Sequence, residues 1–563
     1  MKKNKYFLKS TTSILLFIFL ISSCFTAKIS NDDISNRTGE IIKYDFLSSD
    51  LKKKSDSKIV LNKIINSEIR INKNYIDNSF FCTCFITASP YFYETDKLVL
   101  RADGFDIKKI SLSESGNQQN LKYLYSGDTL TVFLNKKYSR YQTYKVYIEY
   151  NLNKISNNLF FFQNSAVADS VKEIKSWSFM PILFEQNEIN FCDIYFTGKR
   201  DEKTILSGVL DVSLLNTDGT RTDRWKTGNL PADRNILIAG NYKNSKTYWR
   251  NVGIECFSEE KNLKIAEEYL KNTKKMIEFF FRKFKYDFPF SNFSQIVVKG
   301  LNFDSYTANN CVIYSDKVFE NPLYADKIQF EILSVKNVCS QWFGSLICGK
   351  DKYSENLNDA ISLIGVYLWL EHYYPKSESE KFFLNNLSNY MTMCKSLTES
   401  NTVEYQDEMS ILRLFFLIKK IKDEIGNEAF LNVLQYYVSQ NAGKFSDLNK
   451  LKIAIEEITG RNYDYIFSAY DKNFDFEKII VEYSSHKHDS TYVKIRIPDN
   501  CNIRYLSEFE GVLYFHFKDR TEFKNILIKN NQTELSYLFE NKLDSLTFKT
   551  EYEGVLLPEI IRK

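Results

Sequence analysis

The spacing of apolar residues changes twice along the chain, and these changes constrain the fold more than any single motif. From about residue 46 to 250, apolar and polar side chains alternate, as in the segments 97–113, 128–134 and 144–152. Alternation places one set of side chains on each face of an extended strand. This part of the chain is therefore predicted to be mostly β-sheet.

A helical spacing begins near residue 258. Ile265, Leu270, Ile277 and Phe280 would lie near one face of a helix, which predicts a helix over 261–284. Two short strand-like stretches follow, at 294–303 and 309–316. Further helices are expected at 326–342, 357–373, 379–394, 406–424, 427–440 and 447–458.

Alternation returns after about residue 488. Val493, Ile495 and Ile497 face one way in a strand, whereas Lys494 and Arg496 face the other. The pattern predicts a β domain, a mixed domain rich in helices, and a small β domain. Their predicted bounds are 46–255, 256–485 and 486–563.

Length and charge agree with a folded, multidomain protein. The chain has 563 residues, more than one ordinary core accommodates. It is 44% hydrophobic and 26% charged, which is a globular composition and not a disordered one. The net charge of +4 is spread over 75 basic and 71 acidic residues, so the sequence has no nucleic-acid footprint.

The N-terminus has the features of an export signal. A basic start, MKKNKYFLK, precedes the apolar run SILLFIFLISS, which is too short for a comfortable membrane span. Ile21-Ser22-Ser23-Cys24 resembles the lipobox of bacterial lipoproteins, which implies cleavage of residues 1–23 and acylation of Cys24. Residues 24–45 would then be a polar tether. The alternative is an ordinary signal peptide with an incidental cysteine.

The remaining cysteines predict no metal site. Ten cysteines are present, and nine remain if Cys24 is acylated, so they cannot all pair within one chain. Their scattered positions lack metal-type spacing. Cys82 and Cys84 would share one face of a strand, either as a disulfide or, the interpretation we favour, as two buried thiols.

Several segments, in a shared order, resemble the aminopeptidase family of zinc peptidases that includes alanyl aminopeptidase and leukotriene hydrolase. The resemblance runs along most of the chain after the tether. It is carried by LVLRADGFDIKKISL, YKVYIEYN, WSFMPILFEQNEINFCDIYFT, RWKTGNLPADRNILIAGNYK, and QWFGSLICG followed by Leu357-Asn358.

The resemblance implies an α+β multidomain fold. It assigns an N-terminal β-saddle domain to 46–255, a thermolysin-like domain to 256–485 and a small C-terminal β-sandwich to 486–563. The large helical domain that ends other members would be absent, because too little chain remains.

At the positions of the family's zinc ligands and general base, this sequence has other residue types. The family motif is His-Glu-x-x-His, with a glutamate nineteen residues beyond the second His. Counted back from Gln341, these positions hold Lys336, Asn337 and Ser340, and the distant carboxylate is Asp359. Zinc takes neutral imidazole or anionic ligands. We therefore expect no zinc and no standard peptidase chemistry.

Two further family positions follow from the resemblance. Ala308 lies at the position where the family has a glutamate that binds the substrate's amino terminus. Asn309, the next residue, is an asparagine as in the family. Tyr405, in EYQDEMSILRL, stands where a tyrosine stabilises the oxyanion. With the zinc ligands replaced, we favour a packing role for Tyr405 over a catalytic one.

We expect Lys336 to occupy the space of the missing ion and to pair with Asp359, their charged atoms lying within about 4 Å. The alternative is an unpaired Lys336 that extends into an open cleft. The four histidines, His372, His486, His488 and His516, lie at no site position.

Three functions remain open. We favour a catalytically inactive, lipid-anchored module at the bacterial envelope, in contact with the membrane through Cys24 and binding peptides or an envelope protein. One alternative is a hydrolase with a non-standard site, such as a Ser340–Lys336 pair. The other is a structural surface lipoprotein in which the cleft has no role.

Overall fold

The computed structural model gives a mixed α+β architecture whose described residues all lie in one compact unit, residues 58–563. Cys24, Tyr405, His486 and His488 lie outside the described residues. The described ranges are 61–76, 79–114, 117–152, 160–162, 179–183, 189–228, 230–299, 301, 303–325, 327–399, 406–464, 466–467, 477–485, 490–496, 508–529, 532–539, 541, 543–550 and 556–563.

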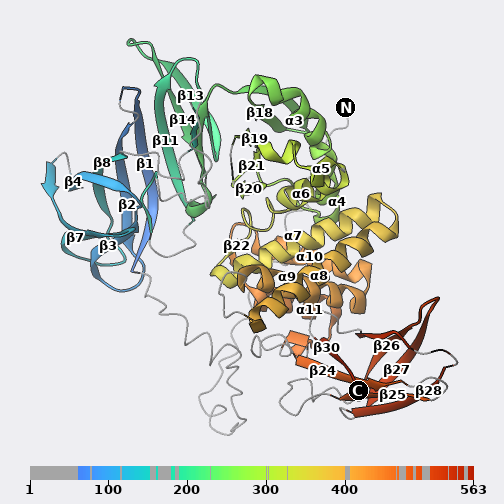
Figure 1. The fold of residues 1–563 in the computed structure, drawn as a ribbon. Coiled ribbons are helices and arrows are strands. Elements are labelled where there is room, and N and C mark those ends of the chain that lie inside the picture. Colours follow the sequence, from blue (N-terminus) through green and yellow to red (C-terminus); the bar gives the residue numbers. More distant parts are fainter. Residues whose placement is uncertain are drawn as a thin grey trace, which may run out of the picture. The chain divides into compact units, whose positions relative to one another are not determined.

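The N-terminal β region is built on one large sheet, drawn in blue and green in Figure 1. Its central pair, β1 and β11, is parallel, whereas β1 and β2 are antiparallel. In sheet order the strands are β13 (Val209–Leu215), β14 (Thr220–Lys226), β11 (Ile189–Lys199), β1 (Asn62–Asn74), β2 (Ser79–Pro90), β8 (Tyr144–Leu152), β4 (Phe105–Glu114) and β5 (Asn117–Asn120), with β15 (Leu230–Pro231) beside β11.

Two smaller sheets complete this region. Its core is formed by the alternate, inward-facing residues of the strands, as the sequence pattern predicts. Cys82 and Cys84 lie in that core as free, buried thiols on one face of β2. The strands are β10 (Ile182–Leu183), β3 (Thr95–Arg101), β7 (Thr129–Tyr138) and β6 (Lys122–Ser126) in one sheet, and β12 (Lys203–Leu206), β16 (Leu237–Gly240) and β9 (Phe160–Phe162) in the other.

A separate mixed sheet begins the second region. Strand β18 pairs in parallel with β19, so the predicted domain boundary at 255 and 256 cuts through β18 and is wrong. The sequence places the boundary just before the helical spacing begins, and the pairing of β17 and β18 with β19 is not visible in the local pattern. Its order is β17 (Lys243–Trp249), β18 (Val252–Ser258), β19 (Asn292–Val298), β21 (Cys311–Ser315) and β20 (Ser305–Ala308).

Helices make up most of the rest of this region (Figure 1). The single helix predicted over 261–284 is two helices with a break at residues 271 and 272. None of the helices in the described ranges has the length and apolar character needed to cross a membrane. The helices are α3 (Leu263–Leu270), α4 (Thr273–Phe284), α5 (Pro322–Ala325), α6 (Lys327–Cys339), α7 (Lys352–Tyr373), α8 (Lys376–Glu399), α9 (Gln406–Ile425), α10 (Asn427–Asn441) and α11 (Leu448–Thr459).

A small β region follows the helices. Buried side chains from two sheets form its core, which agrees with the predicted β-sandwich. Strand β24 precedes the predicted start at 486 but pairs with both β25 and β30, so this region begins earlier than expected. The sheets are β28 (Gln532–Leu538), β25 (Ser490–Arg496), β24 (Glu477–Ser484) and β30 (Leu556–Arg562), and β27 (Thr521–Lys529), β26 (Glu508–His516) and β29 (Ser545–Thr550).

Candidate functional site

Helices α6 and α7 bring the predicted site positions together. Helix α7 begins at Lys352 because the Asp351 carboxylate accepts the Ser354 backbone N–H at 2.8 Å, which caps the helix. Gly365 lets the two helices approach closely, since a Cβ there would lie 2.5 Å from Cys339 Sγ. Asp359, six residues before Gly365 on α7, reaches α6 through its pair with Lys336.

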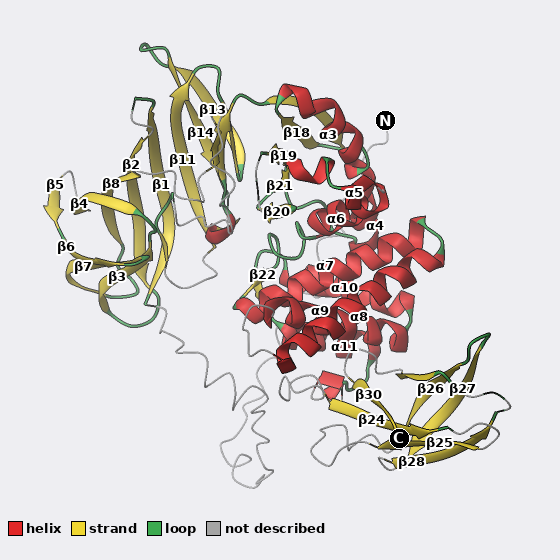
Figure 2. Cartoon of the chain, viewed as in Figure 1, coloured by secondary structure: helices red, strands yellow, loops and turns green. Residues whose placement is uncertain are grey.

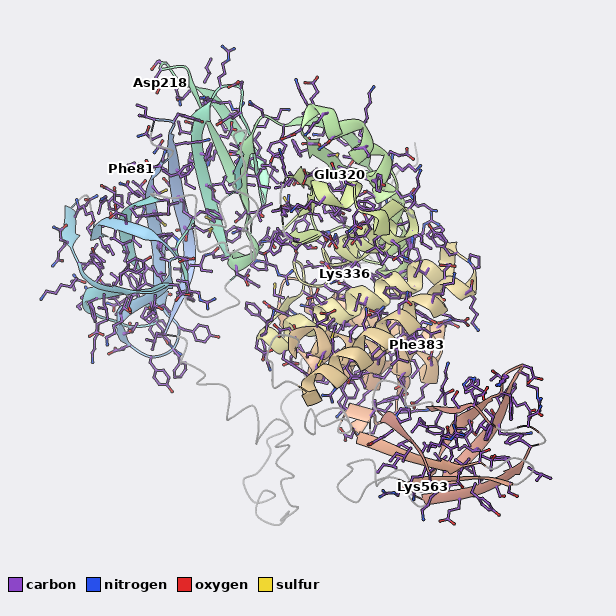
Figure 3. All side chains as sticks on the ribbon, viewed as in Figure 1. Phe81, Asp218, Glu320, Lys336, Phe383 and Lys563 are labelled. Carbon is purple, nitrogen blue, oxygen red and sulfur yellow. The ribbon has the colours of Figure 1, made fainter. Side chains whose placement is uncertain are left out.

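Lys336 and Asp359 form an ion pair across these helices. Lys336 Nζ lies 3.7 Å from Asp359 Oδ1, inside the 4 Å limit set from the sequence. The two side chains are 35% and 40% exposed, and Figure 3 marks Lys336 at its place on α6. Solvent therefore reaches the pair, so its contribution to stability is that of a surface pair, about 0–1 kcal/mol.

Asn337, at the position of the family's general base, is bound by the edge strand β20. Its Oδ1 accepts a hydrogen bond from Thr307 Oγ1 at 2.8 Å, and its Nδ2 donates one to Ser305 Oγ at 2.9 Å. The side chain is buried. Both ends of the amide are thus satisfied by hydroxyl groups of one neighbouring strand.

Ser340, at the position of the second zinc histidine, is also buried and hydrogen-bonded locally. Its Oγ lies 2.9 Å from the Lys336 carbonyl oxygen and 3.0 Å from Ser362 Oγ. Lys336 Nζ instead extends toward Asp359. The geometry therefore does not support the Ser340–Lys336 nucleophile pair considered from the sequence, because such a pair requires contact between the hydroxyl and the amine.

Ala308 and Asn309 connect the site to the N-terminal β region. The carbonyl of Ala308 accepts a hydrogen bond from Gln341 Nε2 at 3.2 Å. Asn309 Nδ2 donates to the Pro231 carbonyl at 2.8 Å, and its backbone N–H donates to the Arg234 carbonyl at 3.1 Å. Both residues are buried, so in this structure they join two regions of the chain.

The residues after Ser340 form a buried turn, not the end of a helix. Helix α6 ends at Cys339, three residues before the predicted end, because the backbone continues in tighter hydrogen bonds such as that from Gln341 N to Val338 O. Trp342 packs against Phe284 and Phe288, with ring centres 5.7 and 5.2 Å apart. These ring contacts hold the turn in the aromatic core.

A charged group that we did not single out from the sequence lies beside the site. The guanidinium of Arg234, from the short 3-10 helix Ala232–Arg234, packs against Gly344, where a Cβ would lie 2.5 Å from Nη1. Gly344 has a φ of +131°, which only glycine adopts without strain. Arg234 lies in segment 224–243, one of the segments that carry the family resemblance, but no feature of that segment indicated that this arginine lies beside the site.

Carboxylates surround Arg234. Burial disfavours the charged form of Arg234 and so lowers its pKa. The negative charges of Glu355 and Asp233 outweigh this effect, and the pKa of Arg234 is raised. Burial raises the pKa of Glu355 above its usual 4.5; Arg234 lowers it in part, and Asp233 raises it further. Glu355 and Asp359 lie four residues apart on one face of α7, where like charges repel unless cations lie nearby. Arg234 and Lys336 are those cations.

Comparisons with known proteins agree with this fold. The profile of the peptidase family M1 domain matches residues 268–470, which contain α6, α7 and every site position from 308 to 359. A solved structure, Legionella pneumophila aminopeptidase A in complex with aspartic acid, is similar with a TM-score of 0.68 at 11% sequence identity. The match covers 90% of this chain and 60% of that one, so this chain spans about three fifths of that chain's length.

No curated protein sequence matches the chain. At 11% identity, the structural match establishes the fold alone. The domain match and the fold agree with the resemblance found in the sequence. Residues 268–470 thus form a domain similar to that of peptidase family M1.

Proposed function

We propose that this protein is an exported, lipid-anchored member of peptidase family M1 that lacks the family's zinc chemistry and binds peptides or a protein partner at the bacterial envelope. The observation that carries the proposal is the donor set at the four site positions. It consists of an ammonium group, an amide, a buried hydroxyl and a single carboxylate, from Lys336, Asn337, Ser340 and Asp359.

This donor set does not fit zinc. A lysine ammonium has no lone pair to give, and an amide has no basic site that takes a proton from water at neutral pH. The one carboxylate, Asp359, is already paired with Lys336. Across the described ranges, no three His, Cys, Asp or Glu side chains lie together as a metal site requires.

Solvent exposure favours a binding role over a purely structural one. Lys336 and Asp359 face solvent, so these positions are not filled by neighbouring apolar side chains. Glu355 and Arg234 add charge beside them. Exposed, oppositely charged groups can orient a polar ligand such as a peptide through its backbone and its charged ends.

The decisive experiment is elemental analysis of the purified protein, together with an aminopeptidase assay in added zinc. We expect no bound zinc and no turnover. The matched control restores the family residues through Lys336→His, Asn337→Glu, Ser340→His and Asp359→Glu, and we expect this variant to bind zinc. Stoichiometric zinc in the unaltered protein would refute the proposal.

The lipid anchor is tested separately. Cells that express the full chain would be supplied with a labelled fatty acid, and the protein would be recovered and examined for label. We expect label on the unaltered protein and none on the Cys24→Ser variant, because the cysteine thiol is the predicted site of acylation. Label retained by the variant would exclude Cys24 as the site.

A further inference from the structure

Exposed aromatic side chains gather on two neighbouring connections of the N-terminal β region. The β2–β3 connection carries Tyr91, Phe92 and Tyr93, which are 62%, 60% and 58% exposed. The β7–β8 connection carries Arg140 and Tyr141, and Tyr141 is 80% exposed. Arg140 Cζ lies 5.7 Å from the Phe92 ring centre and 4.7 Å from that of Tyr141. We name these five residues the aromatic tip.

The aromatic tip differs from the single exposed apolar residues that every protein surface carries. Four of its five residues form a contiguous group: Phe92 and Tyr93 pack edge to face, with centres 5.0 Å apart, and Arg140 links Phe92 to Tyr141. The tip residues are also absent from the hydrophobic cores of the described region. A contiguous exposed group of this kind marks an interaction site.

The charges around the aromatic tip point to the kind of partner. The segment 136–145, KKYSRYQTYK, contains four basic residues and no acidic residue, whereas the β2–β3 connection carries one exposed acidic residue, Glu94. Lys136, Lys137 and Lys145 are exposed, as is Arg140. Tyrosine rings, with an apolar body and a polar end, prefer the headgroup level of a bilayer, and basic side chains are attracted to anionic lipid headgroups.

The position of the aromatic tip points to the same partner. The backbone N–H of Tyr91 donates to the carbonyl of Leu61 at 2.9 Å. Leu61 is the residue at which the described chain begins, after the segment that leads from Cys24. Figure 2 shows the β2–β3 connection as a loop beside the beginning of β1. The described chain therefore begins beside the aromatic tip.

We propose that the aromatic tip is a membrane-docking surface that places its rings among the headgroups of an anionic phospholipid bilayer. The proposal rests on the proposed envelope location but not on acylation. Docking would hold the N-terminal β region against the membrane surface.

The test uses the chain from residue 25 to its end, which contains all described residues but no acylated cysteine. Flotation with phosphatidylglycerol vesicles should recover the unaltered protein with the lipid. Replacing the three aromatic residues by Tyr91→Ser, Phe92→Ser and Tyr93→Ser should lower the partition coefficient by about tenfold or more, because their apolar area no longer leaves water.

The matched control is Phe523→Ser on β27, which removes a 65% exposed aromatic ring far along the chain and should leave vesicle binding unchanged. The thermal unfolding temperature checks that each variant is folded. Equal binding by the triple variant and the unaltered protein would overturn the proposal, as would the absence of binding by the unaltered protein.

A fluorescence measurement tests insertion directly. With Phe92→Trp, vesicles should shift the tryptophan emission to shorter wavelength, and brominated lipids should quench it, whereas Phe523→Trp should show neither effect. Identical responses of the two variants would overturn the proposal. Because this chain lacks Cys24, failure here leaves the acylation result untouched, and failure of acylation leaves this result untouched.

Discussion

The segment SVKNVCSQWFG contains two regions that differ sharply. Its first half holds Lys336, Asn337 and Ser340, whose polar groups are matched by local partners on α7, β20 or the helix backbone. Its second half holds Trp342 and Phe343, which are buried among the aromatic side chains of α4 and α10. The two halves are adjacent in sequence but are held by different forces.

The difference shows which side chains of this segment are maintained by packing. A buried ring contributes to the core whether or not a reaction takes place beside it, so the core retains it. The polar side chains at positions 336, 337 and 340 can be replaced with little loss of stability, provided that the polar groups of the new side chain find hydrogen-bond or ion-pair partners. The predictions below measure this difference, starting with the second half of the segment.

Trp342→Ala should have the largest effect, a loss of about 3–5 kcal/mol in the free energy of unfolding. The substitution leaves a cavity between Phe284 and Phe288 that close-packed neighbours cannot fill. Denaturant unfolding would measure the loss. Trp342→Phe is the control: it should cost less, since Trp342 Nε1 has no hydrogen-bond partner among the described residues. Equal losses would mean that the indole nitrogen matters.

Gly344→Ala should cost about 1–3 kcal/mol, because its φ of +131° is strained for alanine. The new methyl group would also displace the Arg234 guanidinium. The double variant with Arg234→Ala separates the two causes. If the contact contributes, the combined loss measured by thermal unfolding should be smaller than the sum of the single losses. Additive losses would assign the whole effect to the backbone.

Asn337→Ala should cost about 1–2 kcal/mol, because it leaves the hydroxyls of Ser305 and Thr307 without their amide partner. Asn337→Asp tests the same bonds differently. It keeps the acceptor for Thr307 but loses the donor to Ser305, so a smaller loss than that of alanine is expected. No change in unfolding free energy for Asn337→Ala would mean that the hydroxyls find other partners.

Much of the architecture could be predicted because it depends on periodicity. The six predicted helices after residue 326 are all present, although α7 begins five residues earlier, at a cap set by Asp351. Apolar spacing alone does not mark such a polar first turn. The break between α3 and α4 was missed because the apolar residues on its two sides were assigned to one helix face, although residues 271–275 between them are all polar.

The site could be predicted only where a motif fixed the register. The resemblance gave the positions of Lys336 and Asp359, and the helices place their charged atoms 3.7 Å apart. Both side chains reach solvent, so the pair is a surface ion pair. Arg234 and Glu355 were missed, because contacts between distant segments leave no trace in local spacing.

Glu355→Gln should change how stability depends on pH. Burial raises the pKa of Glu355 above 4.5 in the folded protein. Between 4.5 and that raised value the folded state holds a proton that the unfolded state releases, so stability falls as pH rises through this window. Relative to the unaltered protein, Glu355→Gln should therefore gain in unfolding free energy as pH rises above 4.5.

Thermal unfolding over a pH series would measure this gain, with Glu457→Gln at an exposed position of α11 as the control. A difference between Glu355→Gln and the unaltered protein that does not change with pH would show that the proton is held equally in both states. The same result would mean that the charges around Arg234 do not affect the stability of α7.

Lys336→Ala should have the smallest effect, a loss of at most about 1 kcal/mol, because the ion pair is exposed to solvent. Asp359→Ala should behave alike, and the double variant should lose no more than either single one if the pair is the only interaction lost. The comparison with Trp342→Ala then becomes quantitative. A Lys336→Ala loss comparable to that of Trp342→Ala would mean that Lys336 contributes as much to the free energy of unfolding as the buried aromatic turn does. The contrast between the two halves of the segment would then be wrong.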